Sequence, residues 1–472
     1  MHSRIAIALI ICALVSSLPT TTAQQPASVT TIYVPVISAN RIQPFGFETS
    51  TGALYNPAVY AQAGAMNANW VRLNTISWRE AQPTPDSPIN WNAPSFQQFE
   101  QEAQAASALG LQAMAIIDDH PSWATGNSSK ICAAILDEYH DEFAAFVQAV
   151  VARYSQSPYF VRYWELGNEP DVDPSLLSGT EPFGCWGDKN DEYYGGERYG
   201  RMLRVVTPAI RTADPGAKVI FGGLLMDRPA NTLPSHEGKP FNFLEGALRA
   251  GAAPFFDILA FHAYAVFYPA LSNTDIDLTQ GVWASRGGLT LGKVRFLRDV
   301  LQRYGVNKPI ILNETGLRCW QPCGNLALHE QAQANHLIRS SMRAFANGVE
   351  AYIWYTLQGA GWQDSGLLDG NQQPRPAYTA MKVAIERLNE VRFPPQSFTG
   401  YGTGLEAYRF SGNNFALDVI WSVDATTRTI TLPQSSFIAA YRRDGSPLTP
   451  AISGGNVTLN VGFENIYLKR IP

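Results

Sequence analysis

The chain alternates between short runs of apolar residues and longer segments in which apolar residues recur every three or four positions. Runs of the first kind are typical of buried parallel strands, and segments of the second kind are typical of amphipathic helices. Eight such runs occur, at 42–49, 69–76, 111–118, 160–167, 217–223, 256–264, 308–315 and 350–357. Eight buried strands alternating with helices predict an α/β fold, a (β/α)8 or TIM barrel, over residues 42–392.

An open, doubly wound parallel sheet would show the same alternation of strands and helices. Sheets of that kind often carry a glycine-rich phosphate loop, GxGxxG, directly after the first strand. The first predicted strand and the residues after it read FGFETSTGA, which lacks this motif. The closed barrel is therefore the preferred prediction, and the open sheet is the alternative.

From about residue 397 the pattern changes to short stretches of alternating apolar and polar residues. Segments such as SGNN, DATT and DGSP separate these stretches, as turns separate the strands of an antiparallel sheet. Residues 397–472 are therefore predicted to form a small antiparallel β-sandwich domain. The apolar stretch TIYVPVI falls within residues 24–41, which we interpret as a linker or as a further strand of that domain.

Residues 1–23 have the three parts of a secretory signal peptide. Arg4 provides the basic start, an apolar run covers residues 5–15, and Ala23 ends a stretch of small residues. This run is too short to cross a bilayer comfortably, so an uncleaved membrane anchor is only the alternative. The mature protein is expected to be secreted, without membrane contact after the signal is cleaved.

Composition and charge narrow the class of function. The chain is 46% hydrophobic and 16% charged, so it can bury a large core. The formal net charge of −5 becomes −6 when Arg4 leaves with the signal peptide (−5 − 1). The sequence has neither runs of Lys and Arg nor a basic helix, and a nucleic-acid partner is therefore not expected.

Four of the five cysteines remain after signal cleavage, and an even number in an exported protein suggests two disulfides. Cys319 and Cys323 are close enough in sequence to pair locally, which leaves Cys132 and Cys185 as the second pair. Three pairings are formally open, and a zinc site is the alternative. Because neither CxxC nor a Cys/His cluster with zinc spacing occurs, no metal site is predicted.

Polar and ionisable residues occupy the C-terminal ends of most predicted strands. In a barrel, the loops that leave these ends carry the chemistry. Such side chains are costly to bury unless they are paired, so their clustering indicates a functional site. They are Arg72, Asn74, Asp118, Asp119, His120, Asn168, Glu169, His262, Tyr264, Asn313, Glu314 and Trp354.

The dipeptide Asn-Glu ends both the fourth and the seventh predicted strand, at residues 168–169 and 313–314. In a closed barrel the two carboxylates can flank one substrate bond. A separation of about 5–5.5 Å suits retaining glycoside hydrolysis, in which one carboxylate is the nucleophile and the other the acid/base. Asn-Glu-Pro alone is also common at helix starts, but the second pair, with His262 and Tyr264 between the two, favours catalysis.

These motifs resemble those of glycoside hydrolase clan A, the retaining (β/α)8 glycosidases, over roughly residues 42–390. In that clan an Asn-Glu-Pro after the fourth strand carries the acid/base, and a Glu that ends the seventh strand is the nucleophile. Residues 168–170 and Glu314 match these two positions. The C-terminal β domain is similar to the accessory domain of the β-xylosidase and α-iduronidase families, and cellulase-like families share the barrel pattern.

The resemblance implies a role for each matched residue. Glu169 protonates the leaving oxygen and then deprotonates water, while Glu314 attacks the anomeric carbon and forms a glycosyl ester. Asn168 binds the sugar 2-hydroxyl. The supporting residues are Arg72 and Tyr264, which orient Glu314; His120 and His262, which reach sugar hydroxyls or Glu169; and Trp354, which offers a flat face to the sugar ring.

The expected function is that of a secreted, cofactor-free retaining glycoside hydrolase acting on a plant- or microbe-derived oligosaccharide or polysaccharide. One rival is a metal-dependent hydrolase, which would need histidines at several strand ends, often His-x-His on the first strand, where this chain reads GFETS. The other rival is a non-catalytic carbohydrate-binding protein on a decayed glycosidase barrel. Such proteins usually lose one carboxylate, whereas Glu169 and Glu314 are both present here.

Overall fold

The structure, a computed structural model, describes residues 43–179, 181, 183–226 and 239–472. All of them belong to the larger of two compact units of the chain, Ile37–Pro472. The predicted signal peptide (1–23) and the segment 24–41 lie outside the described residues, so both interpretations remain predictions.

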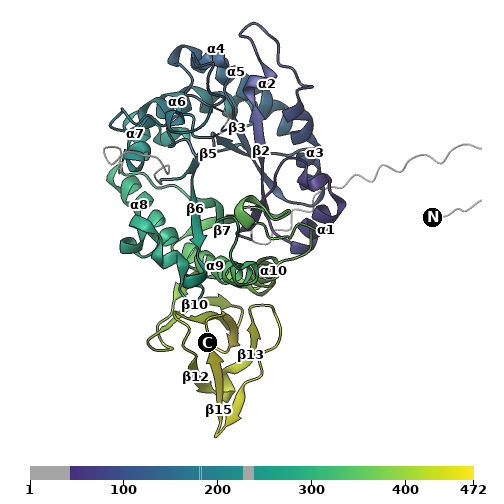
Figure 1. Cartoon of the computed structure of the whole chain (residues 1–472), viewed down its shortest axis with the longest axis vertical. Coiled ribbons are helices and arrows are strands. Elements are labelled where there is room, and N and C mark those ends of the chain that lie inside the picture. Colours follow the sequence, from purple (N-terminus) through teal and green to yellow (C-terminus); the bar gives the residue numbers. More distant parts are fainter. Residues whose placement is uncertain (1–42, 180, 182, 227–238) are drawn as a thin grey trace, which may run out of the picture. The chain divides into compact units, whose positions relative to one another are not determined.

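Eight parallel strands form a closed barrel in sequence order, and the first strand pairs with the last (Figure 1). They are β1 (Phe45–Glu48), β2 (Trp70–Ser77), β3 (Gln112–Asp118), β4 (Tyr163–Leu166), β5 (Lys218–Leu224), β6 (Ile258–Phe267), β7 (Ile310–Cys319) and β8 (Val349–Trp354). All eight predicted strands and the closed barrel are confirmed, and the open-sheet alternative is wrong.

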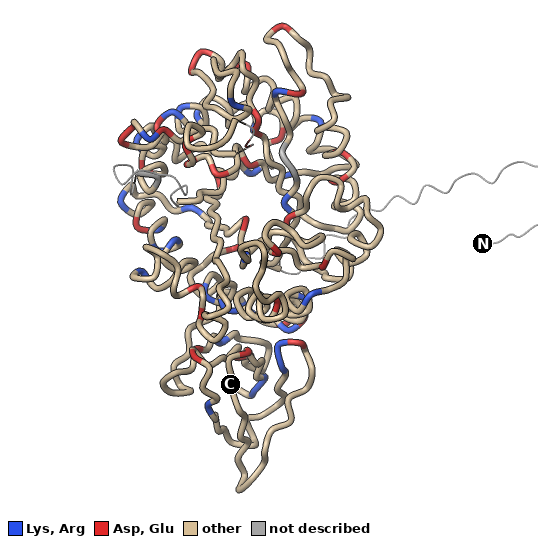
Figure 2. Tube along the Cα trace, in the orientation of Figure 1, with Lys and Arg blue, Asp and Glu red and all other residues tan. Residues whose placement is uncertain are grey.

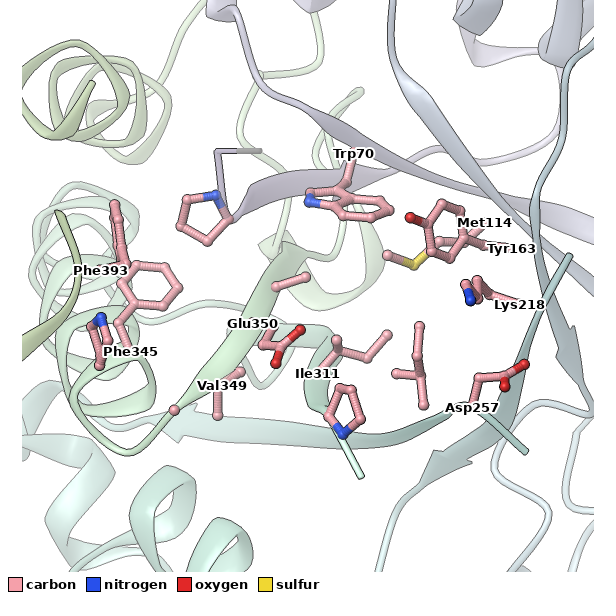
Figure 3. Close-up of a pocket in the computed structure, with 16 residues that line it drawn as sticks. Trp70, Met114, Tyr163, Lys218, Asp257, Ile311, Phe345, Val349, Glu350 and Phe393 are labelled. Atoms are coloured by element: carbon pink, nitrogen blue, oxygen red, sulfur yellow. The ribbon is translucent and has the colours of Figure 1, made fainter. Parts of the chain in front are cut away.

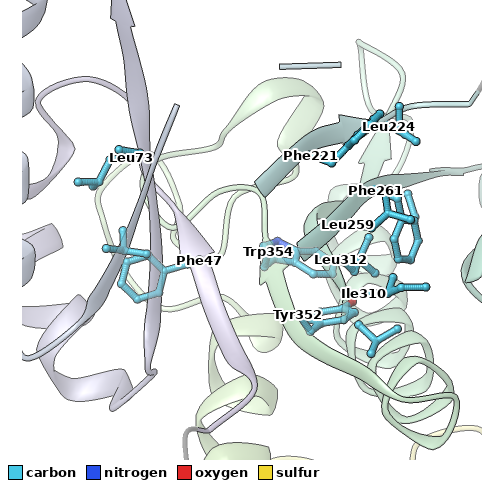
Figure 4. Packing of buried hydrophobic residues seen from close by; sticks show 14 of the residues in the cluster. Phe47, Leu73, Phe221, Leu224, Leu259, Phe261, Ile310, Leu312, Tyr352 and Trp354 are labelled. Carbon is cyan, nitrogen blue, oxygen red and sulfur yellow. The ribbon is translucent and has the colours of Figure 1, made fainter. Parts of the chain in front are cut away.

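Helices surround the barrel and cover the outer side of its strands (Figure 1). In β7, Ile310 and Leu312 pack outward in the main core, whereas Ile311 between them belongs to the apolar cluster inside the barrel. Figure 4 shows this outer packing on several strands. The helices are α1 (Pro57–Met66), α2 (Trp78–Ala81), α3 (Pro94–Ala108), α4 (Ser122–Thr125), α5 (His140–Tyr154), α6 (Gly196–Ala213), α7 (Phe243–Arg249), α8 (Leu289–Arg303), α9 (Leu326–Ala346) and α10 (Pro376–Leu388).

The C-terminal residues form the predicted β sandwich. A five-stranded antiparallel sheet, ordered β13-β16-β11-β10-β9, and a three-stranded sheet, ordered β12-β15-β14, share an apolar cluster that includes Ile420, Ile430 and Leu459. The strands are β9 (Val391–Ser397), β10 (Leu405–Gly412), β11 (Ala416–Ser422), β12 (Arg428–Pro433), β13 (Phe437–Arg442), β14 (Ala451–Ser453), β15 (Asn456–Val461) and β16 (Ile466–Arg470).

The β-sandwich domain begins earlier than predicted, with strand β9. It pairs with β10 and begins at Val391, within the range predicted for the barrel, rather than at residue 397. Its sequence, VRFPPQS, contains two prolines, and proline cannot donate a hydrogen bond to a sheet. A strand of this composition is tolerated at the edge of the sheet, where β9 lies, but it does not show the alternating pattern of an ordinary strand.

Both disulfides join the favoured cysteine pairs, Cys132–Cys185 and Cys319–Cys323. Within the described part of the chain, none of the helices has the length and apolar character needed to traverse a bilayer. Lys and Arg positions are interspersed with Asp and Glu positions along the chain (Figure 2).

One buried carboxyl should make stability depend on pH. Glu102 of α3 accepts hydrogen bonds from the Thr49 hydroxyl (3.2 Å) and the Leu54 amide (3.0 Å), and burial raises its pKa to about 7. Its unfolded pKa is about 4.3, so the folded state binds more protons between these values and loses stability as the pH rises through them.

Glu102→Gln abolishes this titration and can keep both contacts. The difference in unfolding free energy, variant minus wild type, should therefore rise by about 3 kcal/mol as the pH is raised from 4.5 to 8. Urea unfolding at several pH values measures it. A pH-independent difference between the two proteins would contradict this.

Candidate active site

The two ends of the barrel differ in chemistry. A cavity of about 650 Å³ opens at the N-terminal ends of the strands, where Trp70, Tyr163 and Val349 line it (Figure 3). Each of these residues is the first of its strand. Barrel enzymes place their chemistry at the opposite, C-terminal ends, where a cluster of buried ionisable residues of this chain lies. The candidate site is therefore at the C-terminal end and not in this cavity.

Strand geometry brings these ionisable groups together. Side chains alternate along a strand, so the positions that face the barrel interior recur every second residue. On four strands the inward residues near the N-terminal end belong to or pack against the interior apolar cluster: Trp70, Tyr163, Ala260 and Ile311. Two positions further along, the same strands carry Arg72, Glu165, His262 and Asn313. The barrel interior thus changes from apolar to polar toward the C-terminal end.

Arg72 is the centre of the cluster. Its guanidinium binds Glu165 through Nε (2.8 Å) and Nη2 (3.0 Å), and its Nη1 contacts Oε2 of both Glu48 (2.7 Å) and Glu314 (2.5 Å). Nη2 also donates to Oδ1 of Asn168 at 2.8 Å. Burial opposes the charged guanidinium, but its acidic neighbours, Glu165 foremost, raise the pKa of Arg72 well above its usual range. Burial alone would raise the pKa of Glu165, and Arg72 nevertheless lowers it.

Glu169 and Glu314, the two predicted catalytic carboxylates, face each other. One oxygen of each, together with a ring nitrogen of His262, lies within 4.8 Å of the others. His262 Nδ1 is 2.9 Å from Oε1 of Glu169, and its Nε2 is 3.7 Å from Oε2 of Glu314. Burial lowers the pKa of His262 to about 4, so the ring is neutral at neutral pH.

Tyr264 completes the surroundings of Glu314. Its hydroxyl donates a hydrogen bond to Oε1 of Glu314. Burial, followed by the charge of Glu314, raises the pKa of Tyr264 well above its usual value. The phenol therefore stays protonated and remains a donor, so that both oxygens of Glu314 have a fixed partner.

Two aspartates hold the segment that carries Glu169. The Asn168 amide donates to Oδ2 of Asp118 at 2.9 Å, and the carboxylate of Asp171 accepts from the amides of Leu225 (2.9 Å) and Met226 (2.6 Å). Burial raises the pKa of each aspartate to about 7. Glu169 itself has φ 47°, a left-handed conformation that is uncommon outside glycine and is often found at functional sites.

His120 does not reach the pair of glutamates. Its Nδ1 is 2.8 Å from the carbonyl oxygen of Ala133, and its Nε2 is 3.5 Å from Oδ1 of Asp118. The ring is buried, and burial lowers its pKa to about 4. The structure therefore corrects the expected contact with sugar or Glu169: His120 supports the loop after β3, alongside Asp118.

The role expected for Trp354 is also wrong. It is fully buried, and its indole N–H donates to the carbonyl oxygen of Ser365 at 2.8 Å, so it offers no face to a sugar. Tyr352 and Trp354 pack in the outer core, whereas Ala351 and Ile353 belong to the interior cluster. The prediction therefore chose the wrong side of β8.

Tyr355, the residue after Trp354, lies close to the site. It is half-buried, and its ring centroid lies 5.9 Å from that of Tyr264. Burial, followed by the charges of Glu48 and Glu314, raises its pKa. Three residues of the site were thus missed: Tyr355, Glu48 and Glu165. Strand alternation could have found the two glutamates. Glu48 follows Gly46 by two positions and Glu165 follows Tyr163 by two, so both are on the inward side of their strands.

Among the residues that the structure describes, two groups of side chains are near enough to hold a metal ion. In the first, Asp118, His120 and Cys185, the sulfur of Cys185 is bonded to Cys132 and cannot act as a thiolate ligand. The second consists of the two site glutamates and His262. Carboxylate and imidazole are ligands that zinc accepts, so this group is the one relevant to a metal-dependent alternative.

Comparison with known proteins identifies the family. A model of the Cellulase family, glycosyl hydrolase family 5, matches residues 36–333, which is 298 residues (333 − 36 + 1) of 472. No curated protein matches the chain.

Solved structures share its fold. A family 39 glycoside hydrolase from the gut symbiont Bacteroides cellulosilyticus WH2 has a TM-score of 0.67 at 18% identity, covering 91% of this chain and 81% of that chain. A GH30 endoxylanase from Clostridium papyrosolvens C71 has a TM-score of 0.59 at 14% identity, covering 91% and 96%. A GH39 β-xylosidase from Caulobacter crescentus has a TM-score of 0.58 at 14% identity, with coverage of 92% and 97%. At these low identities, the TM-scores show a common fold and nothing further. The family model, in contrast, matches more than half of the chain. The chain therefore belongs to the Cellulase family, glycosyl hydrolase family 5, and is a glycoside hydrolase.

Proposed function

We propose that this protein is a secreted glycoside hydrolase that cleaves O-glycosidic bonds with retention, with Glu314 as nucleophile and Glu169 as acid/base. The observation that carries the proposal is the approach of one oxygen of Glu169 to within 4.8 Å of one oxygen of Glu314. Retaining enzymes keep their carboxyl groups about 5–5.5 Å apart, whereas inverting enzymes need roughly 6.5–9.5 Å to admit a water molecule.

In the first step, Glu314 attacks the anomeric carbon while protonated Glu169 gives its proton to the leaving oxygen. Arg72 and Tyr264 each hold one oxygen of Glu314, and these two contacts orient the carboxylate for attack. Asn168, held by Arg72 through its Oδ1, keeps its amide nitrogen for the sugar 2-hydroxyl. The products are a glycosyl ester on Glu314 and the free leaving group.

In the second step, Glu169 takes a proton from water, and the water oxygen displaces Glu314 from the anomeric carbon. Glu169 must therefore be stable with and without its proton. The neutral ring of His262, 2.9 Å from Glu169, suits both states, because an imidazole nitrogen accepts from the acid in one tautomer and donates to the carboxylate in the other.

The proposed substrate is a neutral glycan of plant or microbial origin. Within the site, Arg72 is surrounded by Glu48, Glu165 and Glu314, and a uronate would add a further negative charge. Neighbours in fold described as an endoxylanase, a β-xylosidase and a glucosidase make xylosides and glucosides the first substrates to test. Secretion is supported by the signal-peptide pattern in residues 1–23 and by the two disulfides.

The proposal is tested by screening the purified protein on nitrophenyl glycosides and plant polysaccharides, beside the Glu169→Ala and Glu314→Ala variants. We expect hydrolysis of at least one substrate by the wild type and strongly reduced turnover in both variants. Sugar binding without any turnover by the wild type would instead identify a non-catalytic carbohydrate-binding protein.

The acid/base role of Glu169 predicts a dependence on the leaving group. On a substrate with a poor leaving group, Glu169→Ala should lower kcat/KM by about 10²- to 10⁴-fold, because the departing oxygen needs a proton. On a dinitrophenyl glycoside, whose leaving group needs no proton, the first step should be nearly unaffected. Steady-state kinetics on both substrates measures the difference, and equal losses on the two would argue against this role.

Chelation distinguishes the metal-dependent rival. Glu169 and Glu314 act as nucleophile and proton carrier in the proposed mechanism, so dialysis against EDTA should leave kcat/KM unchanged. The measurement is activity before dialysis, after it, and after addition of Zn²⁺. Loss of activity on dialysis with recovery on Zn²⁺ would favour a metal ion held by the two glutamates and His262.

A further inference from the structure

The site contains a third carboxyl group, on β1, that the proposed mechanism does not use. The side chain of Glu48 is 11% exposed, like those of Glu169 (11%) and Glu314 (9%), whereas that of Glu165 is 0% exposed. Glu48 is therefore as exposed as the two proposed catalytic glutamates, and double displacement needs only those two.

The two oxygens of Glu48 have different surroundings. Oε2 accepts a hydrogen bond from Nη1 of Arg72 at 2.7 Å, and the same Nη1 contacts Oε2 of Glu314 at 2.5 Å. Among the residues that the structure describes, Oε1 has no hydrogen-bond partner, and it is not one of the fully enclosed atoms. Oε1 is thus the oxygen available to a molecule bound beside Glu314.

Glu48 is also firmly placed. Its carbonyl oxygen accepts from the Thr356 hydroxyl at 2.8 Å and from the Leu357 amide at 2.9 Å, both in the segment after β8. With its backbone held by these contacts and Oε2 held by Arg72, the side chain has little freedom. Such a fixed polar group is suited to selecting a ligand by position.

The groups around Glu48 favour its protonated form. Arg72 is the cation among them, and it already binds Glu165 through two nitrogens and contacts Glu314. Burial first, and then the charges of Glu314 and Glu165, raise the pKa of Glu48 well above its usual range, although Arg72 opposes this. The titratable groups that face it are Arg72 on β2, Glu165 on β4, Tyr264 on β6, Glu314 on β7 and Tyr355 after β8.

Building on the proposed function, we propose that Glu48 is a substrate-binding residue that acts as a carboxylic acid: its Oε1–H donates a hydrogen bond to a hydroxyl oxygen of the sugar bound at Glu314, while Oε2 stays on Arg72. The acid form adds a donor without adding a negative charge next to the nucleophile. It would select a neutral sugar that presents a hydroxyl at that position.

Glutamine and alanine at position 48 separate the protonated form from the charged one. The amide of Glu48→Gln keeps an acceptor for Arg72 and a donor for the sugar, whereas Glu48→Ala removes both. We measure kcat/KM against pH on the dinitrophenyl glycosides of xylose and glucose, for which ionisation of Glu169 does not limit the first step. Wild-type kcat/KM should fall at alkaline pH as Glu48 ionises, and Glu48→Gln should lose this fall.

At neutral pH, Glu48→Gln should stay within a few-fold of wild type, and Glu48→Ala should be about 10- to 100-fold lower. For the wild type, kcat/KM should fall strongly on the monodeoxy analogue that lacks the hydroxyl bound by Glu48. For Glu48→Ala, which already lacks this contact, the same analogue should lower kcat/KM only slightly. The proposal is overturned if Glu48→Gln keeps the alkaline fall, if both variants equal wild type, or if every monodeoxy analogue has the same effect on wild type and Glu48→Ala.

Infrared spectroscopy gives a readout that does not depend on turnover. The difference spectrum of wild type minus Glu48→Gln at neutral pH should contain the C=O stretch of a carboxylic acid. Carboxylate bands in its place would overturn the proposal. If the wild type hydrolyses no glycoside at all, the proposed function fails, whereas the infrared result still decides the protonation of Glu48.

Discussion

Replacing Glu314 with alanine is expected to lower kcat by roughly 10⁵-fold, because the substitution removes the atom that attacks the anomeric carbon. The loss should be seen on dinitrophenyl glycosides as well as on polysaccharides, since a better leaving group does not replace a nucleophile. Steady-state kinetics of the purified variant measures it. Folding should be retained, because the side chain lies at the surface end of the barrel interior and is not part of its apolar core.

Azide provides the control for this variant. The shortened side chain leaves space beside the anomeric carbon, so added azide should restore turnover and give a glycosyl azide of inverted configuration. Glu350→Ala is the matched substitution, because Glu350 lies on β8 at the opposite end of the barrel (Figure 3). It should have wild-type activity and no response to azide. Unchanged kcat in Glu314→Ala would show that another residue is the nucleophile.

Replacing Arg72 with methionine is expected to cost about 3–5 kcal/mol of unfolding free energy. The substitution leaves Glu165, which is fully buried, without its cationic partner, although the Gly223 amide and the Asn313 side chain still donate to it, each at 2.9 Å. Activity should fall as well, because Glu314 loses one of the two contacts that orient it. Urea unfolding and kinetics on the same sample measure both effects.

Two further variants separate the buried charge from loss of packing. Arg72→Met combined with Glu165→Gln should recover part of the lost stability, because a neutral amide replaces the unpaired carboxylate. Arg201→Met is the surface control: the pair of Arg201 with Asp137 has side chains 45% and 53% exposed, so its loss should cost at most about 1 kcal/mol. If Arg72→Met cost no more than Arg201→Met, the central place given to Arg72 would be wrong.

The sequence was sufficient for the barrel and for the pair of glutamates. Eight apolar runs of strand length predict the barrel, and the repeated Asn-Glu at two strand ends marks the residues that the fold brings within 4.8 Å. Both signals are local in sequence. They need only the rule that parallel strands present their C-terminal ends on one face.

The residues that were misjudged depend on which side of a strand they face. Trp354 and Tyr355 are neighbours, and a shift of one residue exchanges the helix-packed side for the interior. Glu48 and Glu165 belong to no sequence motif. They matter because they bind Arg72, which lies on another strand. His120 has a site-like sequence position, but its ring packs beneath the loop after β3, a contact that only the folded chain defines.

The central claim is that Glu314 forms a covalent bond with the sugar during turnover. It is tested most directly by incubating the enzyme with the 2-deoxy-2-fluoro glycosyl fluoride of the sugar it hydrolyses, followed by mass spectrometry of the digested protein. We predict one glycosyl adduct, on the peptide that contains Glu314, absent from Glu314→Ala, together with a product of retained anomeric configuration by NMR. An adduct on another residue, or an inverted product without any adduct, would contradict the account.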